Sequence, residues 1–157
     1  MSDTKKYDVA VIGAGPGGYA AAFRAADLGK KIIMIEKDQA LGGACLNRGC
    51  IPSKALLHIA KVMEDAKSLE SSGVSFSDPH LDLEGIRNWK NSVVSKLNKG
   101  ISQLAKVRNV EILQGTAEFI TKNELSISNG EQKQTVEFKD CIIATGSRAS
   151  SIPDIEI

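Results

Sequence analysis

The residues best suited to chemistry are two cysteines, Cys45 and Cys50, separated by four residues. Two thiols are too few for a structural zinc ion, which generally takes about four ligands, and Cys141 lies in a different predicted element. A redox-active disulfide fits the pair better, and two unconnected thiols on a packed helix are the alternative. Pro52 can begin a helix, whose N-terminus would favour the thiolate form of Cys50. If that helix extends back to Cys50, Lys54 lies on the same side.

The composition is that of an ordinary globular protein, with 157 residues of which 42% are hydrophobic and 25% charged. The net charge of +1 indicates neither nucleic acid nor an anionic membrane as a partner. No apolar run approaches the ~20 residues that span a bilayer, and no signal-peptide core is present. We therefore expect a soluble, cytoplasmic protein, in which a close cysteine pair is catalytic or metal-binding rather than structural.

Near the N-terminus, the pattern predicts two buried strands joined by a helix. Apolar runs occupy 7–12 and 31–36, and the alanine-rich segment between them reaches Leu28, before Gly29. Such runs are typical of strands buried on both faces of a parallel sheet, and glycine is typical of the position after a helix. The segment is therefore predicted to be a βαβ unit, the repeating element of α/β folds.

Three glycines in this unit, Gly13, Gly15 and Gly18, have the spacing of a dinucleotide-binding turn. Gly13 allows a tight turn, Gly15 lets the backbone approach a pyrophosphate, and Gly18 permits close packing of helix on strand. Glu36, which ends the second strand, would accept hydrogen bonds from a ribose diol and repel the 2′-phosphate of NADP. The turn suits either FAD or NAD, and a glycine turn without a ligand is the alternative.

The later segments predict two helices followed by short strands. A helix over about 52–70 and an amphipathic helix over about 83–104 should pack on each other or on the sheet. Strand-like runs, with a turn at Asn129-Gly130, then predict a small antiparallel β-meander over about 110–139. A buried-strand pattern over 141–146 returns the chain to the parallel sheet.

The cysteine segment from Gly42 to Leu57, GGACLNRGCIPSKALL, resembles the redox signature of the dihydrolipoamide dehydrogenases more closely than those of glutathione or mercuric reductases. Together with the glycine turn and the strand ending at Thr145-Gly146, it is similar to flavoprotein disulfide reductases over essentially the whole chain. In that family the first fingerprint binds FAD. The resemblance implies an α/β fold: a Rossmann-like, three-layer FAD-binding domain of parallel sheet and helices, with the small antiparallel β-meander.

The resemblance also implies roles for individual residues. Cys45 would be the interchange thiol that attacks lipoamide, and Cys50 the charge-transfer thiol against the flavin ring. Lys54 would be the cation near the reactive nitrogen of the flavin. Arg48 departs from the small apolar residue expected between the cysteines and adds a charge beside the disulfide.

Further residues are implied to hold the cofactor. The segment at Gly115 and Ala117 would meet the adenine, and the turn at Thr145-Gly146 would close over the cofactor. The full set of predicted cofactor-binding residues is Gly13, Gly15, Gly18, Glu36, Lys37, Gly43, Lys54, Gly115, Ala117, Thr145 and Gly146. No residues are predicted to bind a metal.

Members of this family are considerably longer. Residues 1–150 are expected to form the N-terminal part of the FAD-binding domain, and 151–157 a linker to an NAD-binding domain outside this sequence. The complete enzyme would oxidise dihydrolipoamide and pass electrons through the Cys45–Cys50 disulfide and FAD to NAD+. It would be a homodimer serving the lipoamide-bearing acyltransferase of 2-oxo acid dehydrogenase complexes. The segment alone would lack turnover; a segment of another disulfide reductase, or a flavin-binding module without catalysis, is the alternative.

Overall fold

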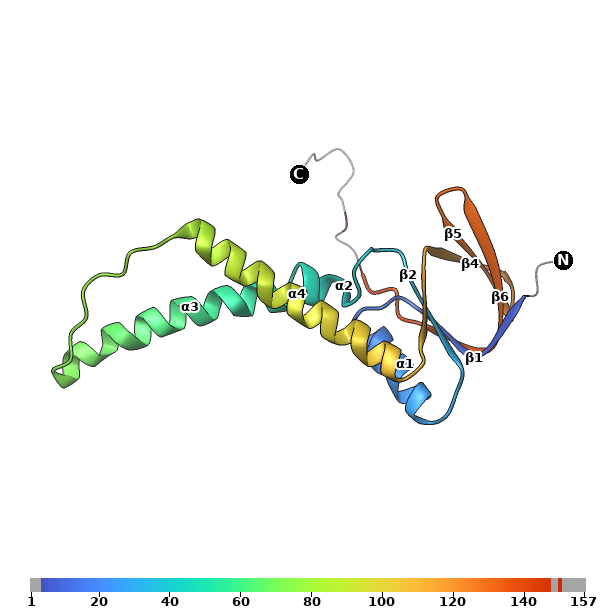
Figure 1. Ribbon diagram of the computed structural model, residues 1–157, viewed down its shortest axis with the longest axis horizontal. Coiled ribbons are helices and arrows are strands. Elements are labelled where there is room, and N and C mark those ends of the chain that lie inside the picture. Colours follow the sequence, from blue (N-terminus) through green and yellow to red (C-terminus); the bar gives the residue numbers. More distant parts are fainter. Residues whose placement is uncertain (1–3, 148–149, 151–157) are drawn as a thin grey trace.

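A computed structural model describes residues 4–147 and residue 150, so the predicted linker over 151–157 lies outside the described residues. A mixed sheet is flanked by helices, and one long helical pair extends away from it (Figure 1). The strands are β1 (Lys5–Ile12), β2 (Ile32–Glu36), β3 (Glu111–Gln114), β4 (Thr116–Thr121), β5 (Glu124–Asn129) and β6 (Gln132–Ile143). The helices are α1 (Pro16–Asp27), α2 (Gly43–Asn47), α3 (Cys50–Ser68), the 3₁₀ helix η1 (Leu69–Ser72) and α4 (Leu83–Val107).

The strands of the described chain form a single sheet in the order β3-β2-β1-β6-β5-β4. β1 pairs in parallel with β2 and β6, and β2 pairs in parallel with β3, whereas β4, β5 and β6 are antiparallel. The predicted βαβ unit is confirmed. The predicted meander is wrong at its N-terminal end, because Glu111–Gln114 pairs in parallel with β2. Strand β6 belongs to both the parallel and the antiparallel part of the sheet.

Two apolar layers cover the two faces of the parallel strands. One face packs against α1 and α4, and the other packs against the antiparallel strands. From Val9 to Val11 and from Ile32 to Ile35, alternate residues point to opposite layers, as period-two geometry requires. Val9, Val11, Ile32 and Met34 face the helices, and Ala10, Ile33 and Ile35 face the meander. Tyr7 also faces the meander, because the amides of Asp8 and Val9 both donate to the Lys31 carbonyl and interrupt the alternation there. The predicted three-layer α/β architecture is therefore confirmed, with the meander as the third layer.

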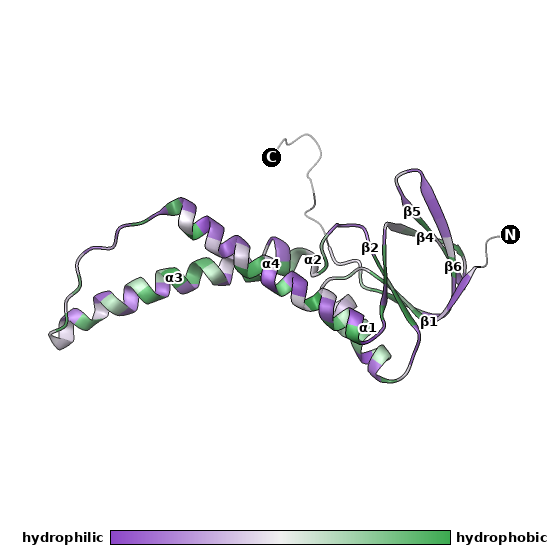
Figure 2. Ribbon diagram, viewed as in Figure 1, coloured by the Kyte–Doolittle hydropathy of each residue, from purple (hydrophilic) through white to green (hydrophobic). Residues whose placement is uncertain are grey.

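The pair formed by α3 and α4 extends away from the sheet (Figure 1). The C-terminal part of α4 returns to the core, where Ile101 and Ala105 are buried. Hydrophobic and hydrophilic residues are mixed along the projecting part (Figure 2), and large apolar side chains such as Leu57 and Trp89 are exposed there. Among the described residues, no helix combines the length and the apolar composition needed to cross a bilayer.

The cysteine segment folds differently from its prediction at two points. Cys45 lies within α2, a helix of five residues that the sequence pattern did not reveal. Helix α3 begins at Cys50 rather than at the predicted Pro52. Proline is tolerated in a first helical turn because its nitrogen would have no intrahelical partner there. The two cysteines therefore belong to two helices joined by Arg48 and Gly49.

Leu125 is fully buried, at 0% exposure, in the apolar layer between the parallel strands and the meander. Its substitution tests the packing of this layer. Leu125→Ala is expected to lower the free energy of unfolding by about 2–5 kcal/mol, because it removes apolar contacts and leaves a cavity. Leu57→Ala, at a position 65% exposed on α3, is the matched control and should change it by less than about 0.5 kcal/mol. Urea unfolding followed by circular dichroism measures both; equal losses would contradict the packing described.

Candidate functional site

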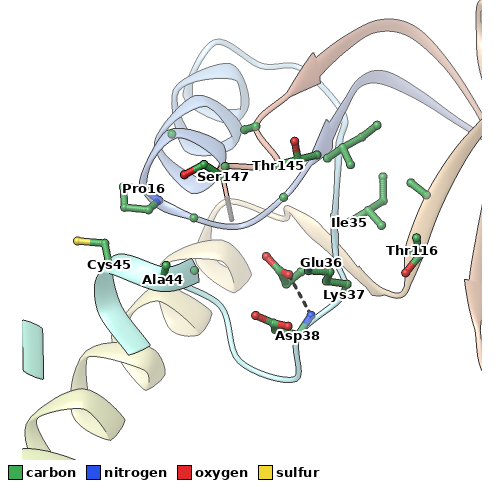
Figure 3. A pocket seen from close by; sticks show the side chains of 18 of the residues that line it. Pro16, Ile35, Glu36, Lys37, Asp38, Ala44, Cys45, Thr116, Thr145 and Ser147 are labelled. Atoms are coloured by element: carbon green, nitrogen blue, oxygen red, sulfur yellow. Dashed lines mark hydrogen bonds between the residues drawn. The ribbon is translucent and has the colours of Figure 1, made fainter. Parts of the chain in front are cut away.

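A cavity of ≈ 630 Å³ opens at the carboxyl ends of β1 and β2 (Figure 3). Its wall includes the turn after β1, the end of β2, the first residues of α2, the beginning of β4 and the segment after β6. Ligands of open α/β sheets bind in the crevice outside the carboxyl ends of the strands. The volume is in the range of small-molecule sites, about 300–1,000 Å³.

The glycine turn has the backbone geometry expected from its sequence. Gly13 has φ 99°, and a Cβ there would lie 2.4 Å from the carbonyl oxygen of Ala144. A Cβ on Gly18 would lie 1.8 Å from the carbonyl oxygen of Gly13, so α1 approaches β1 as closely as it does only because residue 18 has no side chain. Gly15 lines the cavity, where a Cβ would meet only the Cα of Gly43, at 3.9 Å. The N-terminus of α1 therefore faces the cavity with little side-chain bulk.

Glu36 is the buried charged residue of the described chain, 7% exposed, and it lines the cavity. Its Oε2 accepts a hydrogen bond from the Ala14 amide at 2.7 Å, and its Oε1 accepts one from the Asp38 amide at 3.0 Å (Figure 3). Each carboxylate oxygen has a second lone pair, so both can accept a further donor such as a ribose hydroxyl. The backbone contact with Ala14 had no signal in the sequence, and it holds the carboxylate against the glycine turn.

Glu36→Gln is expected to lower the free energy of unfolding by about 1–3 kcal/mol and to weaken dinucleotide binding. An amide presents only one acceptor oxygen, so one of the two backbone N–H groups would lose its partner. Glu118→Gln changes the same charge at an exposed position of β4 and is the control. Urea unfolding gives the stability, and quenching of flavin fluorescence gives the affinity. Equal behaviour of the two variants would contradict the role of Glu36 in the turn.

The structure describes Cys45, Cys50 and Cys141 as free thiols, which for the first two is the reduced form of the predicted pair. Cys45 is half-buried on the cavity wall (Figure 3), whereas Cys50 is exposed and lies outside that wall. Cys141 is half-buried on β6. The disulfide itself, and the assignment of Cys50 to the flavin, stay predictions.

Cys50 acts on the acidity of Cys45. A side-chain interaction with Cys50, followed by burial and the charge of Cys50, raises the pKa of Cys45. The Cys50 backbone and the charge of Lys54 act on that pKa in the opposite direction. Cys45 therefore holds its proton to higher pH than an isolated thiol, and Lys54, though outside the cavity wall, is close enough to influence it.

Most of the predicted cofactor residues come together at the cavity. Those on its wall are Gly13, Gly15, Glu36, Lys37, Gly43, Gly115, Ala117, Thr145 and Gly146. Gly18 lies behind the turn, and Lys54 lies on α3 outside the wall. The roles of these residues toward a cofactor stay predictions.

The wall also includes two charged residues that the sequence analysis did not assign to the cofactor. Arg48 Nη1 lies 3.3 Å from Asp38 Oδ2, and the pair links the segment after α2 to the segment after β2. Both side chains are substantially exposed, and such ion pairs contribute little to stability. In the sequence, Arg48 is only a departure from the family pattern, and its spacing of ten residues from Asp38 does not predict their contact.

These features fit the adenosine diphosphate half of a dinucleotide such as FAD. Free backbone N–H groups and the positive end of the helix dipole at the start of α1 favour a diphosphate. The glycines keep side chains out of its place, and Glu36 is positioned for a ribose. Cys45 lies on the same wall.

Comparisons with known proteins agree with this geometry. Residues 7–156 match the family described as pyridine nucleotide-disulphide oxidoreductase. The chain is 53% identical over 147 residues to a dihydrolipoyl dehydrogenase of Buchnera aphidicola subsp. Acyrthosiphon pisum, covering 94% of the chain and 31% of that protein. It is 46% identical over 155 residues to a dihydrolipoyl dehydrogenase of Vibrio cholerae, covering 99% of the chain and 33% of that protein. The chain thus spans about a third of the length of these curated relatives.

A solved structure gives a similar result. The Cu(II) complex of the HOCl-induced flavoprotein disulfide reductase RclA from Escherichia coli superposes with a TM-score of 0.78 at 29% sequence identity, over 96% of this chain and 31% of that one. The resemblance of the thiol segment to dihydrolipoamide dehydrogenases is confirmed by the curated relatives. Because the family match covers almost the whole chain, this protein belongs to the pyridine nucleotide-disulphide oxidoreductase family.

Proposed function

We propose that this chain is the FAD-binding, thiol-bearing part of a dihydrolipoyl (dihydrolipoamide) dehydrogenase. The observation that carries the proposal is the shared wall of one cavity, on which the glycine turn, Glu36 and Cys45 all lie. One thiol of the pair, Cys45, therefore shares the space in which a dinucleotide would bind. The identity to dihydrolipoyl dehydrogenases over nearly the whole chain supports this member of the family.

FAD, when bound, supplies a two-electron acceptor beside the thiols. The chain's own residues would orient it: the start of α1 holds the diphosphate, Glu36 the ribose, and the wall at Gly115 and Ala117 the adenine. The turn at Thr145-Gly146 would close one side. NAD+ as final acceptor, a homodimer and the lipoamide-bearing acyltransferase of 2-oxo acid dehydrogenase complexes belong to the same proposal and concern the longer enzyme.

The thiol pair would exchange with dihydrolipoamide. The reaction would begin with the cysteine pair oxidised to a disulfide. One lipoyl thiolate attacks Cys45 Sγ, the Cys45–Cys50 bond breaks, and Cys50 leaves as a thiolate. The second lipoyl thiolate then attacks the mixed disulfide, which closes the lipoamide ring and releases Cys45, which takes up a proton. Two electrons thus pass from the lipoyl dithiol to the cysteine pair.

FAD titration of the purified chain tests the proposal. We expect saturable quenching of flavin fluorescence and yellow colour retained after desalting, with much weaker binding of NADP because of Glu36. Complete loss of FAD on desalting, together with no quenching at FAD concentrations up to about 1 mM, would contradict a flavin site. A dissociation constant above this value corresponds to a binding free energy weaker than about −4 kcal/mol.

The alternative function is that of another disulfide reductase, which the similarity to RclA keeps open. The oxidised chain is mixed separately with stoichiometric dihydrolipoamide and with glutathione, and counting the protein's own thiols after desalting separates the two functions. We expect one dihydrolipoamide consumed per cysteine pair and a slower reaction with glutathione. The reverse preference would favour the alternative.

A further inference from the structure

Two asparagines connect the long helix α4 to the thiol segment. Asn98, on α4, donates from Nδ2 to Oδ1 of Asn47 at 2.6 Å, across 51 residues of sequence. Asn47, the last residue of α2, donates from its own Nδ2 to the carbonyl oxygens of Leu41 and Gly43, each at 3.0 Å. All three hydrogen bonds are part-buried. The contacts therefore form one relay from α4 to the backbone that precedes Cys45.

The direction of each bond in this relay is determined by the backbone carbonyls of Leu41 and Gly43, which can only accept. The NH₂ group of Asn47 therefore faces them, and its oxygen faces α4, where Asn98 must present its donor end. Without that donor, the part-buried oxygen of Asn47 loses its partner, and α2 loses this side-chain link to α4.

The backbone that Asn47 holds is the wall between the thiols and the dinucleotide turn. Gly42 and Gly43 have φ of 101° and 58°, a conformation that glycine adopts readily but that costs it more conformational entropy on folding than any other residue. The Gly42 amide donates to the Ala14 carbonyl at 2.8 Å, and a Cβ on Gly43 would lie 2.8 Å from the Cα of Gly15. α2 has only five residues, too few to be stable without tertiary contacts.

We propose that Asn98 is a positioning residue of the thiol and cofactor site: acting through Asn47, it fixes the Gly42-Gly43 turn and the place of Cys45 on the cavity wall. The inference deepens the proposed function, because it names the element of the chain that keeps the thiol in register with the dinucleotide turn. Helix α4 thereby takes part in the site although none of its residues lies on the cavity wall.

The test uses Asn98→Asp, which keeps the shape of the side chain but replaces the donor by an acceptor that repels Asn47 Oδ1. Asn98→Ala removes the donor without adding charge and gives a second, milder variant. Asn91→Asp makes the same charge change at an exposed position of the same helix and is the matched control. Each reduced chain is alkylated with iodoacetamide, and peptide mass spectrometry follows the three cysteines separately.

We expect both Asn98 variants to speed alkylation of Cys45, by about fivefold to tenfold for Asn98→Asp, the range for loss of one buried hydrogen-bond partner. The interaction with Cys50 that raises the pKa of Cys45 depends on the position of α2, so displacement of α2 should expose the thiol and lower its pKa. Cys141, on β6, should react at the wild-type rate and so reports that the fold is intact. The dissociation constant of FAD should rise about tenfold in Asn98→Asp and stay unchanged in Asn91→Asp.

Wild-type reactivity of Cys45 in both Asn98 variants would overturn the inference. So would equal acceleration of Cys45 and Cys141 in both, because that result means general loosening rather than positioning. A wild-type chain that fails to bind FAD would instead contradict the proposed function, and the thiol readout would still decide the role of Asn98.

Discussion

Gly18→Ala is expected to lower the free energy of unfolding by about 3 kcal/mol or to prevent folding. A Cβ at this position would lie 1.8 Å from the carbonyl oxygen of Gly13. Backbone cannot move aside as a flexible side chain can, so α1 would have to separate from β1 at the centre of the sheet. The same separation would open the turn, and FAD binding should be lost together with stability. Urea unfolding and flavin fluorescence measure the two effects.

Gly17→Ala is the control because it makes the same chemical change one residue earlier in the same helix. A Cβ on Gly17 would meet nothing within 4 Å, and alanine is favoured over glycine in a helix by up to about 1 kcal/mol. We expect the stability of this variant to equal or exceed that of the wild type. If both variants unfold at the same urea concentration, the close approach of α1 to β1 does not determine the stability of this region.

Replacing either Cys45 or Cys50 by serine is expected to abolish consumption of dihydrolipoamide by the oxidised chain. The exchange requires both sulfurs, one as the atom attacked and one as the leaving thiolate, and a hydroxyl can form neither bond. The expected effect is complete loss rather than a reduced rate. Chromatographic quantification of lipoamide under single-turnover conditions, with the protein's thiols counted after desalting, measures it.

Cys141→Ser is the matched control for both variants. This thiol is half-buried on β6 and is not part of the pair, and burial alone raises its pKa. The variant should consume one equivalent of dihydrolipoamide, as the wild type does. Loss of the reaction in Cys141→Ser, or its persistence in Cys50→Ser, would contradict the assignment of the redox pair.

The parts of the fold that could be predicted from sequence are those whose signal is local. The βαβ unit was predictable because its strands are continuous apolar runs, and the turn because Gly13 and Gly18 mark backbone positions that other residues cannot occupy. The wall position of Glu36 followed from its place at the end of β2. In each case the information lies within a few neighbouring residues.

The rest depends on contacts between distant segments. Glu111–Gln114 has strand composition, but nothing in it shows that it pairs with β2 rather than with the following strands. Helix α2 is too short for a periodic signal, and its support from Asn98 comes from 51 residues away. The exposure of Cys50 outside the cavity wall likewise depends on where α3 begins, and Pro52 pointed two residues too late.

Strand β6 has a consequence for the synthesis of this chain. It gives β1 its second neighbour, pairing Lys5 with Val136 and Ile12 with Ile143. A ribosome adds about 5–20 residues per second, so β1 emerges roughly 6–25 s before the strand that covers its open edge. An apolar strand with a free edge can pair with other chains, and pairing across so long a stretch of sequence is slow. The nascent chain should therefore depend on chaperones most strongly before residues 132–143 leave the exit tunnel.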